Sequence, residues 1–188
     1  TGIGDSRIHF EGGYVAPQLS SSVFPLTGER LTHWMDHQAS VSIFGFMIKD
    51  ESVGRVRLGP GDKPLVFYSL NNNALNLFKL GAANLAEMLL RGGGIEVIAG
   101  LGPIKEIKNI AEAKAILNHD LQASDFRIIG FHPLGTCRLG ANSDLGVTDF
   151  EHRVFGTDNL YVMDGSNVPT SLGVNPQITI MSLATRAA

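Results

Sequence analysis

Three short segments between residues 131 and 188 constrain the fold of this chain more than any other feature. The first begins with His132 and Pro133, the second is an apolar run that ends in Asp164-Gly165, and the third is Asn175-Pro176 in front of a helical pattern. Proline fixes the local backbone, and the start of a helix favours a bound anion. These parts can build a site for an anionic cofactor, so an enzyme fragment is the leading interpretation.

Length, charge and cysteine content limit the other classes of function. The chain has 188 residues, which suits one domain or parts of two. Fifteen Lys and Arg residues against 18 Asp and Glu residues give a net charge of −3 with no basic run, which argues against nucleic acid as a partner. The single cysteine, Cys137, cannot form an internal disulfide. No apolar run approaches the ~20 residues of a membrane span, and we expect a cytoplasmic protein.

The first 125 residues predict an α+β unit with helices on one face of an open sheet. Residues 40–48 and 65–70 are rich in β-formers, 54–58 alternate, and Gly59-Pro-Gly-Asp62 is a turn, so we expect an antiparallel meander. Asparagines at 71–73 and glycines at 92–94 bound a helical pattern. A short strand over 95–99 and a second helix over 109–118 follow.

After Asp125 the pattern changes to short strands, glycine-rich loops and one terminal helix. We expect strands over 126–131 and 160–163. Asn175 directly precedes Pro176, which suits the first helical position, so we expect Asn175 to cap a helix over 177–187. The start of such a helix stabilises an anion by ~0.3–1 kcal/mol.

His132 is the candidate general base. It lies between a predicted strand and a Pro-Gly turn, and an imidazole with a reference pKa near ~6.5 suits removal of a hydroxyl proton. A structural histidine bonded to a nearby backbone group is the alternative, and the flanking residues favour catalysis. Asp164-Gly165 taken alone is a weak signal, since Asp-Gly is more often a turn.

Taken together, the three segments resemble the C-terminal part of the glucose–methanol–choline (GMC) family of flavin oxidoreductases. The matching pieces are His132-Pro-Leu-Gly-Thr-Cys-Arg-Leu-Gly140, Val154-Phe-Gly-Thr-Asp-Asn-Leu-Tyr-Val-Met-Asp-Gly-Ser166 and Pro169-Thr-Ser-Leu-Gly-Val-Asn-Pro-Gln-Ile-Thr-Ile180. The family often has methionine where Leu139 stands, a departure that affects packing more than mechanism.

The resemblance implies a reaction and a set of residues for it. His132 would take the hydroxyl proton of an alcohol while hydride passes to N5 of FAD, and Asn175, in a position where the family has His or Asn, would hold the hydroxyl oxygen. The residues expected to bind FAD are Asp164 and Gly165, facing the ribityl chain and the pyrophosphate, and Asn175, Pro176, Gln177 and Ile178, around the isoalloxazine ring.

The same resemblance implies two domains. Residues 1–125 would be a substrate-binding (cap) domain with a largely antiparallel sheet backed by helices, and residues 126–188 the C-terminal segment of a Rossmann-like FAD-binding domain. The family's G-x-G-x-x-G fingerprint is missing, because Gly2-Ile3-Gly4 has neither a preceding strand nor a third glycine. We therefore expect a fragment whose partner is the N-terminal FAD-binding half of the same protein, and which alone binds FAD poorly.

Several alternatives remain open from the sequence. A flavin-containing lyase of the same fold would use His132 only for acid–base chemistry, and a non-catalytic interaction domain could keep the scaffold. His33 and His37 have the i, i+4 spacing of metal ligands but no third ligand, which favours packing over a metal site. Cys137 is better explained as a packed thiol than as a nucleophile. The alcohol, the electron acceptor and the oligomeric state are not specified.

Overall fold

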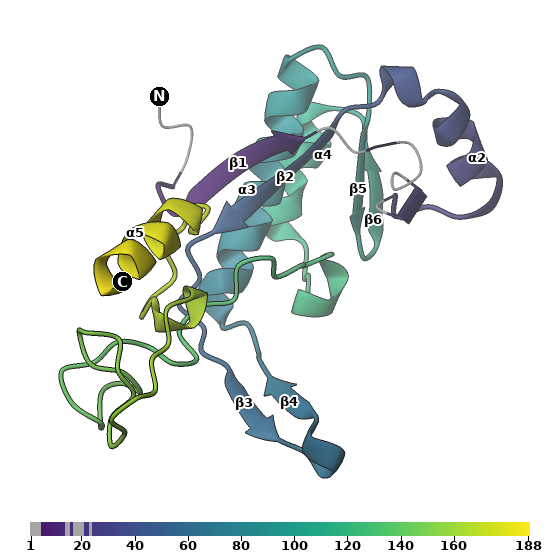
Figure 1. Cartoon of the computed structure of the whole chain (residues 1–188). Helices are drawn as coiled ribbons and strands as arrows, with labels where there is room; N and C mark the ends of the chain where they lie inside the picture. Colours follow the sequence, from purple (N-terminus) through teal and green to yellow (C-terminus); the bar gives the residue numbers. More distant parts are fainter. Residues whose placement is uncertain (1–4, 14–15, 17–20, 23) are drawn as a thin grey trace. The chain divides into compact units, whose positions relative to one another are not determined.

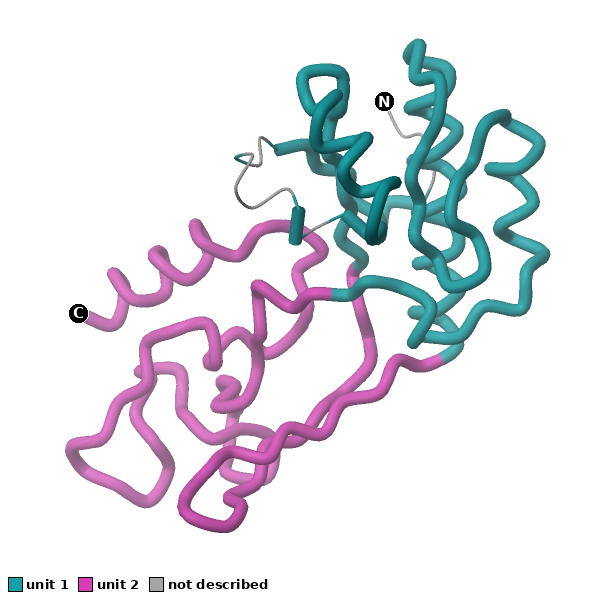
Figure 2. The backbone as a smooth tube through the Cα atoms, turned by 90° about the vertical axis from the view of Figure 1, so that its right-hand side faces the viewer, with its two compact units in different colours: residues 1–48, 72–128 teal, residues 49–71, 129–188 magenta. Residues whose placement is uncertain are grey.

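The computed structural model describes residues 5–13, 16, 21–22 and 24–188, and these form two compact units. Unit 1 combines Thr1–Ile48 with Asn72–Ile128, and unit 2 combines Lys49–Asn71 with Ile129–Ala188 (Figure 2). The chain therefore passes between the units three times. Helices are mixed with small antiparallel sheets, as the α+β prediction requires (Figure 1).

Unit 1 is built around α3 (Asn72–Arg91) and a two-stranded sheet. Strands β1 (Ile8–Gly13) and β2 (Ile43–Ile48) pair in antiparallel register. The ring of Phe46 on β2 lies 5.8 Å, centroid to centroid, from Phe78 on α3. A Cβ atom at Gly81 would collide with the Phe46 ring, so this glycine permits the close packing of helix and sheet.

The predicted limits of α3 are confirmed, and the way it ends is visible. Gly93 takes a positive φ of 100°, its N–H bonds to the carbonyl of Leu90, and the N–H of Gly94 bonds to the carbonyl of Leu89. This is the Schellman arrangement, which satisfies carbonyls at a helix end and requires a left-handed residue. One side of the helix is buried; its buried residues are Ala74, Leu77, Gly81, Ala83, Leu85 and Ala86.

A hairpin and a short helix complete unit 1. Strands β5 (Val97–Leu101) and β6 (Ile104–Ile107) pair with an irregularity between Ile98 and Leu101, and α4 (Ile110–Ala115) follows. The side chain of Asn109 caps α4, since it accepts a bond from the backbone N–H of Glu112. The core cluster here contains Ala83, Ala86, Leu101, Ile107, Ala113, Ile116, Leu121 and Phe126. Helix α2 (Gly28–Asp36) has no buried residue.

Unit 2 has little regular structure. A hairpin of β3 (Arg55–Leu58) and β4 (Pro64–Phe67) is exposed along both strands. The rest consists of loops joined by isolated β-bridges, a 3₁₀ turn (Gly165–Asn167) and α5 (Gln177–Ala187). Among the described residues, no helix is both long and apolar enough to cross a bilayer.

Three predictions of strand structure are wrong. The predicted meander over residues 40–70 does not form. β2 pairs with β1, whereas β3 pairs with β4 in a separate sheet. Residues 126–131 contain no strand, and residues 160–163 contain only the bridge of Tyr161 with Arg153. A strand requires a hydrogen-bonding neighbour, and apolar composition does not supply one.

Candidate active site

The turn at Asp164 is closed by hydrogen bonds between Asp164 and Ser166. Oδ1 of Asp164 accepts hydrogen bonds from the backbone N–H of Ser166 at 2.8 Å and from its hydroxyl at 2.5 Å. These two bonds favour the ionised carboxylate and hold the pKa of Asp164 below its usual value, the side-chain bond having the larger effect. Asp164 is exposed, so a fixed negative charge lies at the surface of unit 2.

Gly165 lies where the three segments found in the sequence come together. A Cβ atom added to Gly165 would lie 3.2 Å from Cδ1 of Ile180 on α5, 3.3 Å from Cδ2 of Leu134 and 3.5 Å from the carbonyl oxygen of Pro133. The turn therefore packs against the residues that follow His132 and against the terminal helix. Only a residue without a side chain fits here without displacing its neighbours.

The segment that carries His132 is shaped by Gly135. This glycine has a φ of 82°, a left-handed conformation that most L-residues disfavour, and its Cβ position lies 3.4 Å from the carbonyl oxygen of Val168. His132 itself is exposed, and the neighbouring Phe131 is 78% exposed. Within the described part of the chain, the imidazole of His132 has no hydrogen-bond partner, so its nitrogens are free for a ligand.

The predicted cap of α5 is wrong by one residue. The carbonyl of Pro176 accepts the first helical bond, from the N–H of Ile180 at 2.9 Å, so Pro176 is the N-cap and Asn175 lies outside the helix. Pro176 has φ −84° and ψ −1° and begins the helical turn itself, so no side chain caps α5. The carboxamide of Asn175 is exposed and is not used in capping. Gln177 and Ile178 are exposed too, Ile178 to 70%.

A buried polar cluster beneath this surface was missed by sequence reasoning. Thr148, His152 and Asn167 are each fully buried. Oδ1 of Asn167 lies 2.9 Å from Nδ1 of His152, and Nδ2 of Asn167 donates to the carbonyl of Cys137 and to Oγ1 of Thr148, both at 2.9 Å. The three residues are separated by loops, and nothing in their spacing signals that they meet.

His33 and His37, for which the sequence favoured packing over a metal site, lie next to each other. The rings of His33 and His37 lie 4.5 Å apart, and Nδ1 of His37 bonds to the carbonyl of His33 at 2.8 Å. Over residues 5–13, 16, 21–22 and 24–188, no group of three or more His, Cys, Asp or Glu side chains is placed to hold a metal ion. Cys137 is a free, partly buried thiol.

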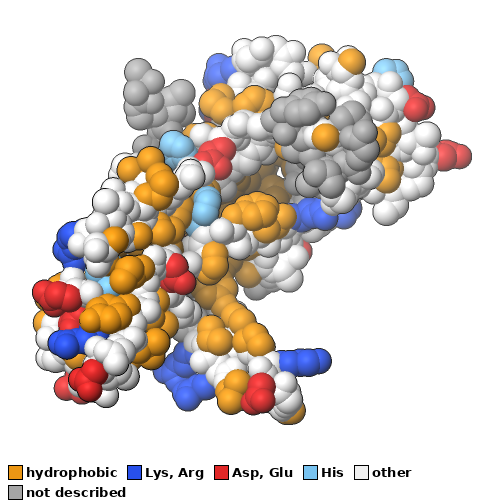
Figure 3. All heavy atoms as spheres, viewed as in Figure 1, with side chains coloured by type: hydrophobic (Ala, Val, Ile, Leu, Met, Phe, Trp, Pro, Cys, Tyr) orange, Lys and Arg blue, Asp and Glu red, His pale blue; other side chains and the backbone are white. Residues whose placement is uncertain are grey.

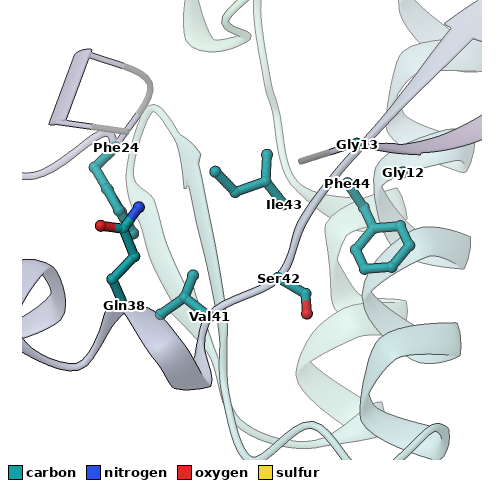
Figure 4. A pocket seen from close by; sticks show the side chains of 8 residues that line it. All are labelled: Gly12, Gly13, Phe24, Gln38, Val41, Ser42, Ile43 and Phe44. Carbon is teal, nitrogen blue, oxygen red and sulfur yellow. The ribbon is translucent and has the colours of Figure 1, made fainter. Parts of the chain in front are cut away.

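Unit 1 contains two hollows lined mainly by apolar side chains. The larger, of ≈ 810 Å³, lies among α2, β2, α3 and the β5–β6 hairpin; its aromatic lining residues are Phe24, Trp34, Phe44, Phe46, Phe78 and Phe126. The smaller, of ≈ 500 Å³, adjoins the start of β2. Figure 4 shows Ile43 directed toward Phe24, and Ser42 and Phe44 directed to the other side, as alternation along a strand requires.

The surface of unit 2 is rich in exposed apolar side chains. Figure 3 shows them over the loops and along the hairpin. Those exposed by half or more are Val53, Val56, Leu58, Val66, Phe67, Tyr68, Ile129, Phe131, Leu145, Phe150, Leu160, Val174 and Ile178. Large exposed apolar patches are typical of interaction sites on proteins.

Comparison with known proteins assigns the family. The family model described as GMC oxidoreductase matches residues 50–184. An uncharacterised GMC-type oxidoreductase of Mycobacterium tuberculosis is 30% identical over 172 residues, which are 92% of this chain and 27% of the relative. A long-chain-alcohol oxidase of Arabidopsis thaliana is 28% identical over 195 residues, covering 95% of this chain and 24% of the relative. A 2-methyl-1,2-propanediol dehydrogenase of Mycolicibacterium austroafricanum is 47% identical over 58 residues, covering 31% and 10%.

The matches also show how much of a relative the chain represents. It spans about a quarter of the length of the curated relatives that match along most of it. The family model covers the His132 segment, the Asp164 turn and the start of α5, the three regions that meet around Gly165. The chain belongs to the GMC oxidoreductase family and represents its C-terminal part.

Proposed function

We propose that this chain is the C-terminal part of an FAD-dependent oxidoreductase that oxidises the CH–OH group of an alcohol, with His132 as the general base. The observation that carries the proposal is the packing of Gly165 against Pro133, Leu134 and Ile180, which joins the His132 segment, the Asp164 turn and α5. Two relatives that match are named for the oxidation or dehydrogenation of alcohols, which supports this class of substrate.

The residues of unit 2 are compatible with FAD. Oδ1 of Asp164 accepts both bonds from Ser166, so Oδ2 can accept a bond from a hydroxyl of the ribityl chain. Gly165 has no side chain and lets a cofactor approach the backbone closely. Helix α5 begins beside Asn175 and has 11 residues, and the first amides of a helix have no intrahelical acceptor. We assign these amides, at Gln177 and Ile178, to the electron-rich edge of the flavin. When bound, FAD supplies the acceptor for the hydride.

The chain's own residues handle the proton and the oxygen. The exposed imidazole of His132 takes the hydroxyl proton, and the carboxamide of Asn175 donates a hydrogen bond to the same oxygen. The electron pair of the O–H bond would become part of the new C=O bond, and FAD held by the residues named above would accept the hydride that leaves the carbon. Deprotonation by a positioned side chain contributes typically ~10²–10⁴-fold to a rate.

The proposed function also assigns a domain to substrate binding and a partner to this chain. We assign residues 1–125 to a substrate-binding domain and 126–188 to the C-terminal part of the FAD-binding domain, whose other part is the N-terminal half of the same protein. The ≈ 810 Å³ hollow of unit 1 is large enough for an apolar alcohol.

The test is anaerobic mixing of the full-length flavoprotein with a series of alcohols while flavin absorbance is followed. We expect alcohol to bleach the flavin in the natural protein and His132→Ala to slow bleaching by ~10²–10⁴-fold at equal FAD content. His119→Ala is the matched control, because His119 is an exposed histidine of unit 1. An unchanged rate in His132→Ala overturns the proposal, and turnover that needs His132 without bleaching favours a lyase.

A further inference from the structure

We propose that Asn167 is a positioning residue that holds the His132 segment and the Asp164 turn in one arrangement. The inference rests on the function proposed above for His132 and concerns a residue that neither the sequence motifs nor the proposed mechanism uses. Asn167 is fully buried and closes the short turn that begins at Asp164. It therefore cannot contact a substrate and can influence the site only through the residues that it holds in place.

The side chain of Asn167 joins three separate segments. It bonds to the carbonyl of Cys137, five residues after His132, to the hydroxyl of Thr148, and to Nδ1 of His152. Both amide hydrogens and the amide oxygen are therefore used. The hydroxyl of Thr148 in turn donates to the carbonyl of Cys137 at 3.2 Å, which closes the cluster.

Backbone bonds extend the same connection. The N–H of Cys137 donates to the carbonyl of Ser166, and the N–H of Leu139 donates to the carbonyl of Asn167, both at 3.0 Å. The N–H of Asn167 donates to the carbonyl of Asp164 at 3.1 Å. A shift of Asn167 therefore moves both the segment from Cys137 to Leu139, which follows His132, and the turn that carries Asp164.

The chemistry of the partners fixes the orientation of the amide. A carbonyl accepts but cannot donate, so Nδ2 of Asn167 must face Cys137, and Oδ1 must face His152. His152 then carries its proton on Nδ1. Its Nε2 is buried and has no partner among the described residues, and its backbone has a φ of 66°.

These two features of His152 are unfavourable for folding alone. A left-handed non-glycine residue and an unpaired buried nitrogen are both costly, and such features persist where the surroundings fix them. An apolar core of the same shape would avoid the cost of the unpaired nitrogen. We infer that the cluster is kept because it fixes the relative position of the segments above it.

The experiment uses the full-length flavoprotein and four variants that change the cluster stepwise. Asn167→Leu keeps the approximate shape and removes all three side-chain bonds, while Thr148→Val removes one hydroxyl and is the milder variant if Asn167→Leu does not fold. Thr148→Ser keeps the hydroxyl. His152→Asn keeps a donor next to Cγ and suits a left-handed backbone. Rates are divided by bound FAD, and FAD dissociation constants are measured separately.

For a positioning role, we expect flavin reduction per bound FAD to fall ~10–100-fold in Asn167→Leu with little change in KM, since a misplacement of about 1 Å costs up to that factor. The rate per bound FAD should fall several-fold in Thr148→Val. In Thr148→Ser and His152→Asn it should stay within about twofold of the rate of the natural protein. In a His132→Ala background, Asn167→Leu should cause no comparable further fall. A lower melting temperature with an unchanged rate per FAD would reduce Asn167 to a structural role.

Failure of the proposed function gives a different result. If none of the alcohols reduces the flavin of the natural protein, the proposed function is refuted. The affinity for FAD still tests the role of Asn167, because Asn167 holds the Asp164 turn. A dissociation constant raised about tenfold or more in Asn167→Leu, but not in His152→Asn, supports positioning of the turn. Equal dissociation constants in all variants overturn the inference.

Discussion

The carboxylate of Asp164 is the clearest case of one residue tuned by its own turn. Its bonds to Ser166 form within three residues and need no distant partner, so the Asp-Gly-Ser sequence contains the information for them. The turn itself is predictable from sequence. Its packing against Leu134 and Ile180 is not, because those contacts join residues far apart in the chain.

The depressed pKa of Asp164 predicts a dependence of stability on pH. A carboxyl whose folded pKa lies below its unfolded value of about 3.8 stabilises the fold above that value and loses this contribution as pH falls through the folded pKa. Ser166→Ala removes the side-chain bond, which is the larger cause of the shift, so the pKa of Asp164 should rise toward its usual value.

The measurement is a carboxyl titration by NMR together with thermal unfolding between about pH 2 and 6. Ser166→Ala should be less stable than the natural protein at pH 6, and the difference should shrink as the solution is made acidic. Asp158→Asn, at an exposed carboxylate of the same unit, is the control. A stability difference that is constant with pH would show that Ser166 acts through packing instead.

At the scale of elements, the sequence predicted three helices and four of the strands by position, but it missed α2, β1 and β6. The limits of α3 follow from asparagines before it and glycines after it, and α4 lies within the range predicted for the second helix. These signals are local. The pairing of β1 with β2 joins residues 30 to 40 positions apart, and the expected strand over 160–163 has only Tyr161 in a bridge. For the candidate site, the segments were predictable and the buried Asn167 beneath them was not.

The contact between α3 and β2 can be tested at Gly81. Alanine there gains ~1 kcal/mol of helix propensity, but its methyl group would overlap the ring of Phe46, which also packs against Phe10 and Phe78. Overpacking of a core costs ~1–3 kcal/mol, so we expect Gly81→Ala to be destabilising by about 1 kcal/mol in denaturant unfolding.

Gly45 provides the matched control on the same sheet. A Cβ atom there has nothing within 4 Å, so Gly45→Ala should leave the free energy of unfolding within ~0.5 kcal/mol. If Gly81→Ala is as stable as the natural protein, the Phe46 ring moves aside freely. The close packing of helix and sheet would then not depend on glycine.

For the whole molecule, exposed apolar surface is the main feature of unit 2. Ile129, Phe131 and Ile178 are exposed by 64%, 78% and 70%, and the chain spans about a quarter of its relatives. We expect the 188-residue chain alone to bind an environment-sensitive hydrophobic dye strongly and FAD weakly, and the full-length protein to do the reverse. Dye fluorescence and FAD titration, each per mole of chain, measure this. An isolated chain that binds FAD as tightly as the full-length protein would contradict it.

The interleaving of the two units has a consequence for synthesis on the ribosome. Unit 1 is complete once residue 128 has emerged, whereas the β3–β4 hairpin belongs to a unit whose residues 129–188 are made only afterwards. At about 5–20 residues per second, residues 129–188 take roughly 3–12 s to make, and the hairpin is without them for at least that long. During translation the hairpin therefore lacks the rest of its unit, and is open to chaperones and proteases, for seconds after unit 1 has closed.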